Sequence, residues 1–262
     1  KVDFSSRGAA IKPLHGVNNS PVVYNGTIQP FVDAGIPFVR THDSGGAYGQ
    51  SVLVDIPNIF RNFEADVDDP ASYDFAFTDA YLATLVNSGC RIFYRLGVTI
   101  ENNYRIKAYR IHPPQDFAKW ARICEHIVRH YNEGWANGFH YGIEYWEIWN
   151  EPENPPMWQG TRDEFFALYR IAANHLKQCF PQIKVGGYGG CGFYAVTGDN
   201  TTEFFKGFIT WFDEFLKFVT DPRTASPLDF YSWHLYTTDP GKILRHAEYV
   251  NARLKAAGLP QV

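Results

Sequence analysis

The segment YWEIWNEPE, residues 145–153, carries the most chemically suggestive side chains of the sequence. Asn150 and Glu151 follow a short aromatic run that is typical of a buried strand. A carboxyl group there, beside tryptophans that limit its solvation, can have its pKa raised toward neutral pH and can donate a proton to a leaving oxygen. Asn150 can offer its amide to a hydroxyl group. A turn without a catalytic role is the alternative, because asparagine and proline both favour turns.

Polar side chains also follow two other apolar runs of the chain. The alternation of a strand sends Arg40 and His42 to the same face. In the segment SWHLY, the same alternation places His234 and Tyr236 on one face with Ser232. These side chains therefore lie where they can act together if the two strands belong to one sheet.

A further run ends in HGVNN and places His15 at another strand end. If the strands close into a barrel, all of these polar ends converge on one rim, as a site for a polyhydroxylated ligand requires. A single histidine on a strand is more often structural, so the interpretation depends on the group as a whole. Hydrogen bonding explains the histidines without a closed ligand set, and the sequence predicts no metal at this rim.

Other charged and titratable residues are expected to be scaffold. Glu147 alternates in phase with Glu151 one layer deeper, where a buried charge needs a partner such as Arg40 or Arg95. His126 and His130 are four residues apart in a helical pattern, but the glutamate of a zinc-protease motif is missing between them. We expect these two histidines at the surface.

Six β-rich runs alternate with six helical patterns, which is typical of βα units around a parallel sheet. The strands are expected at 11–17, 37–41, 91–97, 145–150, 183–188 and 229–236. The helices are expected at 27–34, 74–88, 114–131, 162–179, 202–219 and 241–257. The pattern over 202–219 places Phe205, Phe208, Phe212, Phe215 and Val219 on one core-facing stripe. The sequence predicts one α/β domain over residues 1–262, a (β/α)₈ TIM-type barrel with about six βα units present and truncated before strand 7.

Composition narrows the partners. The 262 residues are 45% hydrophobic, enough for one large core, and 17% aromatic, which suits core packing and also platforms for sugar rings. A formal net charge of −4 leaves no basic face for phosphates, which argues against nucleic acid. Charges interrupt every apolar run well short of the roughly 18 residues that span a membrane, which argues against a membrane partner.

The cysteines and the start of the chain bear on the compartment. No CxxC pair and no metal-like spacing occurs among Cys90, Cys124, Cys179 and Cys191. We expect reduced core thiols, which slightly favours a cytoplasmic protein over a secreted one. N-x-S/T tripeptides at Asn18, Asn25 and Asn200 matter only in a secretory pathway. No signal sequence is visible, although Lys1 in place of Met suggests a trimmed or processed start, and the compartment and the oligomeric state stay open.

The motifs HGVNNSP, VRTHD, WEIWNEPE and SWHLY, in this order and at these intervals, resemble glycoside hydrolase family 39. This family of β-xylosidases and α-L-iduronidases belongs to the large clan of (β/α)₈ retaining glycosidases, and the resemblance covers essentially the whole chain. It implies that Glu151 is the general acid/base, that Asn150 binds the sugar 2-hydroxyl, and that Arg40 supports the nucleophile. The subsite for the reacting sugar is then lined by His42, His234 and Tyr236.

Two departures from the family pattern bear on mechanism and substrate. The family's nucleophile is a glutamate at the end of the seventh strand, which lies beyond Val262, and none of Glu101, Glu144 or Glu153 matches its position. The iduronidase branch has a lysine where this sequence has Tyr236, so a neutral sugar such as xylose is favoured.

The resemblance therefore predicts a retaining, exo-acting glycosidase that needs carbohydrate as its substrate and no cofactor. Three alternatives stay open: a non-catalytic sugar-binding barrel, an α-L-iduronidase-like enzyme, and a structural barrel without a ligand. The last of these requires the polar strand ends to coincide by chance.

Overall fold

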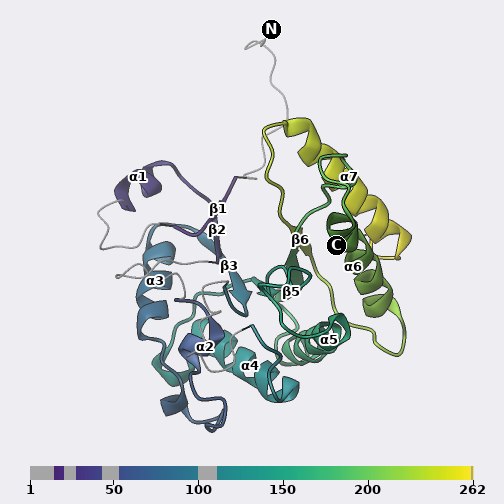
Figure 1. Ribbon diagram of the computed structural model, residues 1–262. Helices are drawn as coiled ribbons and strands as arrows, with labels where there is room; N and C mark the ends of the chain where they lie inside the picture. The colour runs from purple at the N-terminus through teal and green to yellow at the C-terminus, as the bar shows by residue number, and fades with distance from the viewer. Residues whose placement is uncertain (1–14, 21–27, 43–52, 100–110, 261) are drawn as a thin grey trace.

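The computed structural model describes residues 15–20, 28–42, 53–99, 111–260 and 262. In these ranges six parallel strands form one sheet, and each strand pairs with the next one along the chain. The strands are β1 (Val17–Asn18), β2 (Phe38–Thr41), β3 (Arg91–Leu96), β4 (Tyr145–Ile148), β5 (Lys184–Gly190) and β6 (Tyr231–Trp233). The sheet curls with its helices on the outside, as six successive units of a (β/α)₈ barrel do (Figure 1).

The helices of the outer layer follow the strands in alternation. They are α1 (Ile28–Asp33), α2 (Ile56–Ile59), α3 (Ala76–Asn87), α4 (Phe117–Glu133), α5 (Arg162–Cys179), α6 (Glu203–Thr220) and α7 (Pro240–Ala256), with 3₁₀ turns η2 (Pro70–Ser72) and η4 (Trp135–Asn137). Local sequence sets several of their ends. The Thr161 side chain accepts a hydrogen bond from the Glu164 amide in a capping box that begins α5, and Gly134 ends α4 in the left-handed conformation.

The predicted fold class is confirmed, and the predicted elements follow in the expected order, with α2 and the turns η2 and η4 as unpredicted additions. The strand expected at 229–236 is shorter, covering only Tyr231–Trp233. Of the strand expected at 11–17, residues 11–14 lie outside the described residues, as does Thr27 of the first expected helix. The core-facing stripe of α6 is confirmed for Phe208, Phe212, Phe215 and Val219, whereas Phe205 is only partly buried.

The expectation that His126 and His130 lie at the surface is wrong. Their residues are 8% and 1% exposed, because η4 folds back over α4 and covers this face. The His130 ring stacks on Phe75 at 3.6 Å between centroids, and its Nε2 lies 2.9 Å from Asp79 Oδ1. Helix α4 thus buries a second face, against η4, in addition to the face that packs on the sheet.

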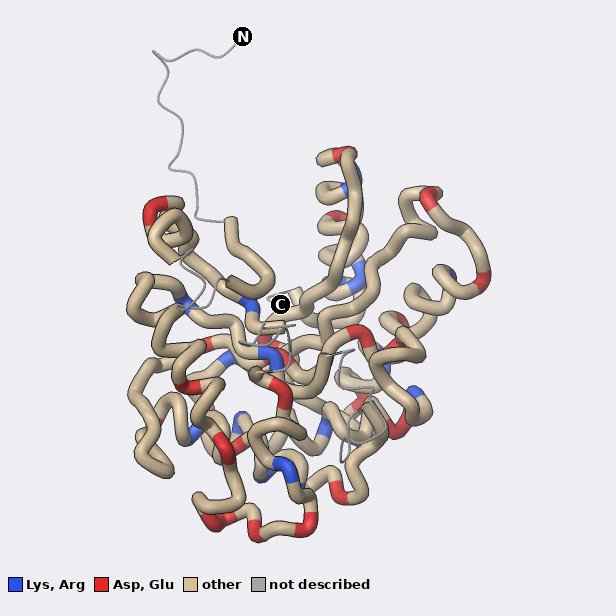
Figure 2. The backbone as a smooth tube through the Cα atoms, turned by 60° about the vertical axis from the view of Figure 1, so that its left-hand side comes forward, with Lys and Arg blue, Asp and Glu red and all other residues tan. Residues whose placement is uncertain are grey.

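The cysteines of the chain differ in burial. All four cysteines are free; Cys90, Cys124 and Cys191 are buried, whereas Cys179 at the end of α5 is partly exposed, contrary to the expected core position. Lys and Arg are interspersed with Asp and Glu along the backbone (Figure 2). Within the described ranges, no helix combines the length and the apolar character that crossing a membrane requires.

Candidate active site

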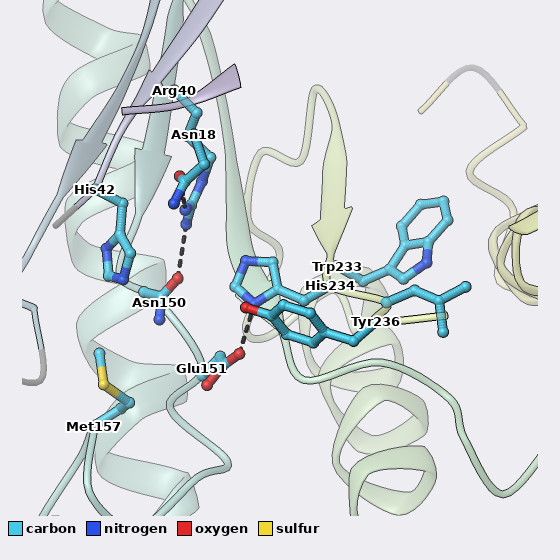
Figure 3. Close-up of a pocket in the computed structure, with 10 residues that line it drawn as sticks. Asn18, Arg40, His42, Asn150, Glu151, Met157, Trp233, His234 and Tyr236 are labelled. Atoms are coloured by element: carbon cyan, nitrogen blue, oxygen red, sulfur yellow. Dashed lines mark hydrogen bonds and ion pairs between the residues drawn. The ribbon is translucent and has the colours of Figure 1, made fainter. Parts of the chain in front are cut away.

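A cavity of about 430 Å³ opens at the carboxyl ends of the strands. Its lining residues are Asn18, Arg40, His42, Asn150, Glu151, Met157, Trp233, His234, Leu235 and Tyr236 (Figure 3). Six of the seven residues predicted from the sequence are therefore brought together. The volume lies within the range of about 300–1,000 Å³ that small-ligand sites occupy.

The seventh predicted residue, His15, does not line the cavity. It is exposed and precedes β1, so it lies toward the amino end of a strand whose carboxyl end faces the cavity. Asn18 at the end of β1 contributes instead, and its Oδ1 accepts a hydrogen bond from Arg40 Nη1 at 3.0 Å. Because β1 begins at Val17, His15 lies before the strand, and Asn18 occupies the carboxyl end at which His15 was expected.

The backbone after β4 adopts an unusual path that presents Glu151. Trp149 and Glu151 have φ of 71° and 47°, in the left-handed region that residues with a side chain rarely adopt. Three backbone hydrogen bonds hold the path: the Trp149 amide donates to Leu96 O, and the Glu151 amide donates to Tyr188 O and Gly189 O. Strained backbone of this kind clusters at functional sites, where the surrounding structure must enforce it.

Arg40 organises the floor of the cavity. Its Nε donates to Glu147 Oε2 at 2.8 Å and its Nη2 donates to Asn150 Oδ1 at 2.7 Å. The buried Glu147 carboxylate also accepts from Ser232 Oγ at 2.6 Å, which confirms that it is paired scaffold with Arg40 as partner. Because Arg40 fixes the Asn150 carbonyl oxygen, the amide Nδ2 faces the cavity as a hydrogen-bond donor (Figure 3).

His42 is a neutral hydrogen-bonding group with a defined tautomer. Its Nδ1 accepts a hydrogen bond from Arg95 Nε at 3.1 Å, which places the ring proton on Nε2. Burial and the charges of Arg95, Arg40 and His234 hold the pKa of His42 far below its usual value. Arg95 is itself fixed by the buried Asp55 carboxylate at 2.5 Å. His42 therefore offers an N–H donor at any working pH.

Glu151 is hydrogen-bonded to two side chains at the mouth of the cavity. His234 Nδ1 lies 2.5 Å from Glu151 Oε1, and Asn154 Nδ2 donates to Oε2 at 3.2 Å. Burial raises the pKa of Glu151, but the hydrogen bond and charge of His234, together with hydrogen bonds from Asn154 and Cys191, lower it by more, so the pKa lies below its usual value. The direction is therefore opposite to the raised pKa expected from the neighbouring tryptophans, because several hydrogen bonds and a nearby charge together exceed the effect of burial.

Tyr236 lies at the outer edge of the cavity. The residue is 85% exposed, and its backbone amide donates to the Tyr194 hydroxyl at 2.8 Å. Ser232 within β6 and His234 directly after it both turn inward, whereas Tyr236 lies three residues beyond the end of the strand at Trp233. The ring is positioned to contact a ligand at the rim.

Glu153 is a further buried carboxyl group near Glu151, although it is not among the residues that line the cavity. Its Oε1 accepts a hydrogen bond from the Cys191 amide at 2.6 Å, whereas its Oε2 is buried without a partner in the described part of the chain. Burial raises the pKa of Glu153 to about 8, with a contribution from the charge of Glu151. The only sequence signal was its position two residues after Glu151.

The raised pKa of Glu153 predicts a pH dependence of stability. Folded Glu153 keeps its proton from pH 4.5 up to about 8, whereas the unfolded chain loses it near 4.5. The folded state thus binds more protons in this window, and the free energy of unfolding falls as pH rises, by at most about 1.4 kcal/mol per pH unit. Urea unfolding of the complete protein at several pH values should show this slope, and Glu153→Gln should flatten it. A slope unchanged in Glu153→Gln would contradict the assignment.

Glycine at position 189 lets β5 approach the Arg40 cluster. Gly189 has a φ of +58°, and a Cβ there would lie 2.9 Å from Arg40 Nη2 and 3.1 Å from Asn150 Oδ1. We expect Gly189→Ala to lower the free energy of unfolding by about 1–3 kcal/mol and to reduce ligand binding. Gly198→Ala is the matched control, because its φ is +74° but no atom lies within 4 Å of the added carbon. Equal losses in both variants, measured by urea unfolding, would mean that the close approach has no effect.

The fold and the cavity together define a class. The six βα units form part of a (β/α) barrel, and its carboxyl-terminal rim carries a glutamate on left-handed backbone, an amide donor and a neutral histidine. The chain belongs to the glycosyl hydrolases family 39, whose sequence profile matches residues 28–257.

Individual relatives agree with this membership. The chain is 28% identical over 202 residues to a β-xylosidase of Geobacillus stearothermophilus, covering 72% of this chain and 36% of that protein. It is 27% identical over 194 residues to a β-xylosidase of Caldicellulosiruptor saccharolyticus, covering 71% of this chain and 35% of that protein. The chain thus spans about a third of the length of these curated relatives.

Solved structures show the same fold. A glucosidase from Croceicoccus marinus superimposes with a TM-score of 0.75 at 27% identity, covering 96% of this chain and 50% of that one. A family 39 enzyme from Xanthomonas axonopodis pv. citri gives a TM-score of 0.67 at 21% identity, covering 98% and 51%. The chain therefore corresponds to about half of each of these structures.

Proposed function

We propose that the complete protein is a retaining, exo-acting glycoside hydrolase for a neutral sugar, β-xylosidase-like, with Glu151 as its general acid/base. The observation that carries this proposal is the placement of the Glu151 carboxyl group at the mouth of the cavity, beside the amide of Asn150. Family membership and the two β-xylosidase relatives support the reaction class.

Glu151 acts twice in the proposed cycle. It first protonates the glycosidic oxygen as the leaving group departs, and it later takes a proton from the water that releases the sugar. Retention requires a second carboxylate about 5–5.5 Å away as nucleophile, and we assign this role to a glutamate at the end of the seventh strand. The negative charge of that nucleophile opposes ionisation of Glu151 and so counteracts the effect of His234 on its pKa.

Asn150, His42 and Arg40 bind and orient the sugar in this proposal. The Nδ2 group of Asn150 donates to the 2-hydroxyl, and the Nε2 proton of His42 donates to a neighbouring hydroxyl. Arg40 keeps the amide in place and presents its charge toward the nucleophile. In glycosidases, hydrogen bonds to the 2-hydroxyl strengthen in the transition state and lower the activation free energy by several kcal/mol.

The charge of the cavity favours a neutral sugar. Among the described lining residues Arg40 is the one Lys or Arg, and its guanidinium already binds Glu147 and Asn150. Tyr236 contributes a neutral ring at the rim, where a uronate would need a cation. We therefore place the α-L-iduronidase-like alternative second.

The test is hydrolysis of aryl glycosides by the complete protein, followed by NMR of the first anomer that forms. We expect an aryl β-D-xyloside to be cleaved with release of β-xylose, and an aryl uronide to be cleaved far more slowly. Initial release of the α-anomer would contradict retention. Preference for a uronide or a glucoside would contradict the proposed substrate while leaving the role of Glu151 intact.

A further inference from the structure

A cluster of three potential metal ligands lies on the outer helices, apart from the cavity. Glu125 comes from α4, and His175 and Cys179 come from α5. The two residues of α5 are four positions apart, so their side chains share one face of the helix. Because α5 ends at Cys179 and β5 begins at Lys184, the cluster lies toward the amino end of the sheet, opposite to the cavity.

The three side chains already contact one another. His175 Nε2 lies 2.5 Å from Glu125 Oε2 and 3.9 Å from Cys179 Sγ, and all three ligand atoms lie within 4.8 Å of one another. Tetrahedral zinc with bonds of about 2.0–2.3 Å needs its ligand atoms roughly 3.3–3.7 Å apart. Shifts of about 1 Å in the side-chain ligand atoms are therefore enough to convert the hydrogen-bonded cluster into a metal site.

The surroundings suit a bound cation. Arg129 Nε donates to Glu125 Oε1 at 2.8 Å, which orients the carboxylate and leaves Oε2 toward the histidine. The side chains of His175 and Glu125 are 29% and 13% exposed, so an ion can reach them from solvent. A zinc ion with one thiolate, one carboxylate and one neutral imidazole gives a complex without net charge beside the Arg129 cation.

We propose that Glu125, His175 and Cys179 form a zinc site that joins α4 to α5. Binding releases the thiol proton of Cys179 to solvent and leaves the imidazole proton of His175 on Nδ1. Three protein ligands leave the fourth position of the tetrahedron to water. The ion would connect α4 to α5, so we expect its binding to raise the free energy of unfolding. This inference is independent of the proposed hydrolase activity.

The test uses the complete protein after removal of metals by a chelator. Titration with Co²⁺ should give a thiolate-to-cobalt absorption band that saturates at one ion per chain, and Zn²⁺ should abolish the band and raise the melting temperature. Cys179→Ser should eliminate the band and weaken Zn²⁺ binding at least about tenfold, a difference of roughly 1.4 kcal/mol. Glu125→Gln keeps a hydrogen-bond acceptor for His175 and should weaken binding without unfolding the helices.

Cys90→Ser is the matched control, because it removes a buried thiol elsewhere in the fold. It should leave the cobalt band unchanged, and all three variants should retain the hydrolysis rate of the parent. Absence of the band in the parent protein, or a band that persists in Cys179→Ser, would overturn the proposal.

Discussion

Glu151→Gln in the complete protein should lower kcat/KM by about 10²–10⁴-fold for glycosides with poor leaving groups. The amide cannot donate a proton, so an alkoxide must depart unassisted. An activated nitrophenyl glycoside should lose far less in kcat/KM, because its leaving group needs no proton. The measurement is a comparison of kcat/KM across aryl and alkyl xylosides for both proteins.

Glu144→Gln is the matched control for this prediction. Glu144 immediately precedes β4, at the other end of the strand from Glu151, and pairs with Arg91 and Lys184. Its substitution should leave kcat/KM for all of these substrates nearly unchanged. Equal losses by Glu151→Gln on good and poor leaving groups would refute the acid/base role and point to a general effect on binding or folding.

Arg95→Met should lower the free energy of unfolding by about 3–5 kcal/mol, the largest stability effect that we expect. The Arg95 and Asp55 side chains are both 0% exposed and lie 2.5 Å apart, so the substitution leaves a buried carboxylate without its cation. The methionine fills a similar volume, which separates lost charge pairing from lost packing. Urea unfolding of both proteins measures the difference.

Arg91→Met tests whether burial is the cause. Arg91 lies on the same strand and pairs with Glu144, but its side chain is 57% exposed. Its loss should cost no more than about 1 kcal/mol, as exposed ion pairs usually do. Arg95→Met also removes the hydrogen bond that holds the ring proton of His42 on Nε2. It should therefore reduce turnover per folded molecule, whereas Arg91→Met should not. Similar losses of stability in the two variants would contradict the burial argument.

Much of the barrel could be predicted from the sequence because its strands and helices alternate at short and regular intervals. The alternation of a strand was enough to place Arg40 with His42 and Ser232 with His234 on the inner face. It failed for His15, whose strand begins later than the apolar pattern suggests. Alternation fixes which face a residue occupies but not where along its axis a strand starts and stops.

The electrostatics of the site could not be predicted in this way. The lowered pKa of Glu151 depends on a contact with His234, which is 83 residues away in the chain. The buried partner of Arg95 is Asp55, which begins the short helix α2 and showed no strand or motif signal. Long-range pairs of this kind follow from the way the curled sheet brings distant strands and loops together, and local patterns carry no information about them.

The most direct test of the central claim is azide rescue of Glu151→Ala in the complete protein. With an activated aryl xyloside, loss of the general base should leave a glycosyl-enzyme that reacts slowly with water. Azide needs no general base and fits the space left by the side chain. We predict that added azide raises kcat and that the product is the β-xylosyl azide. No acceleration by azide, or an azide product of inverted configuration, would contradict the assignment of Glu151 as acid/base of a retaining hydrolase.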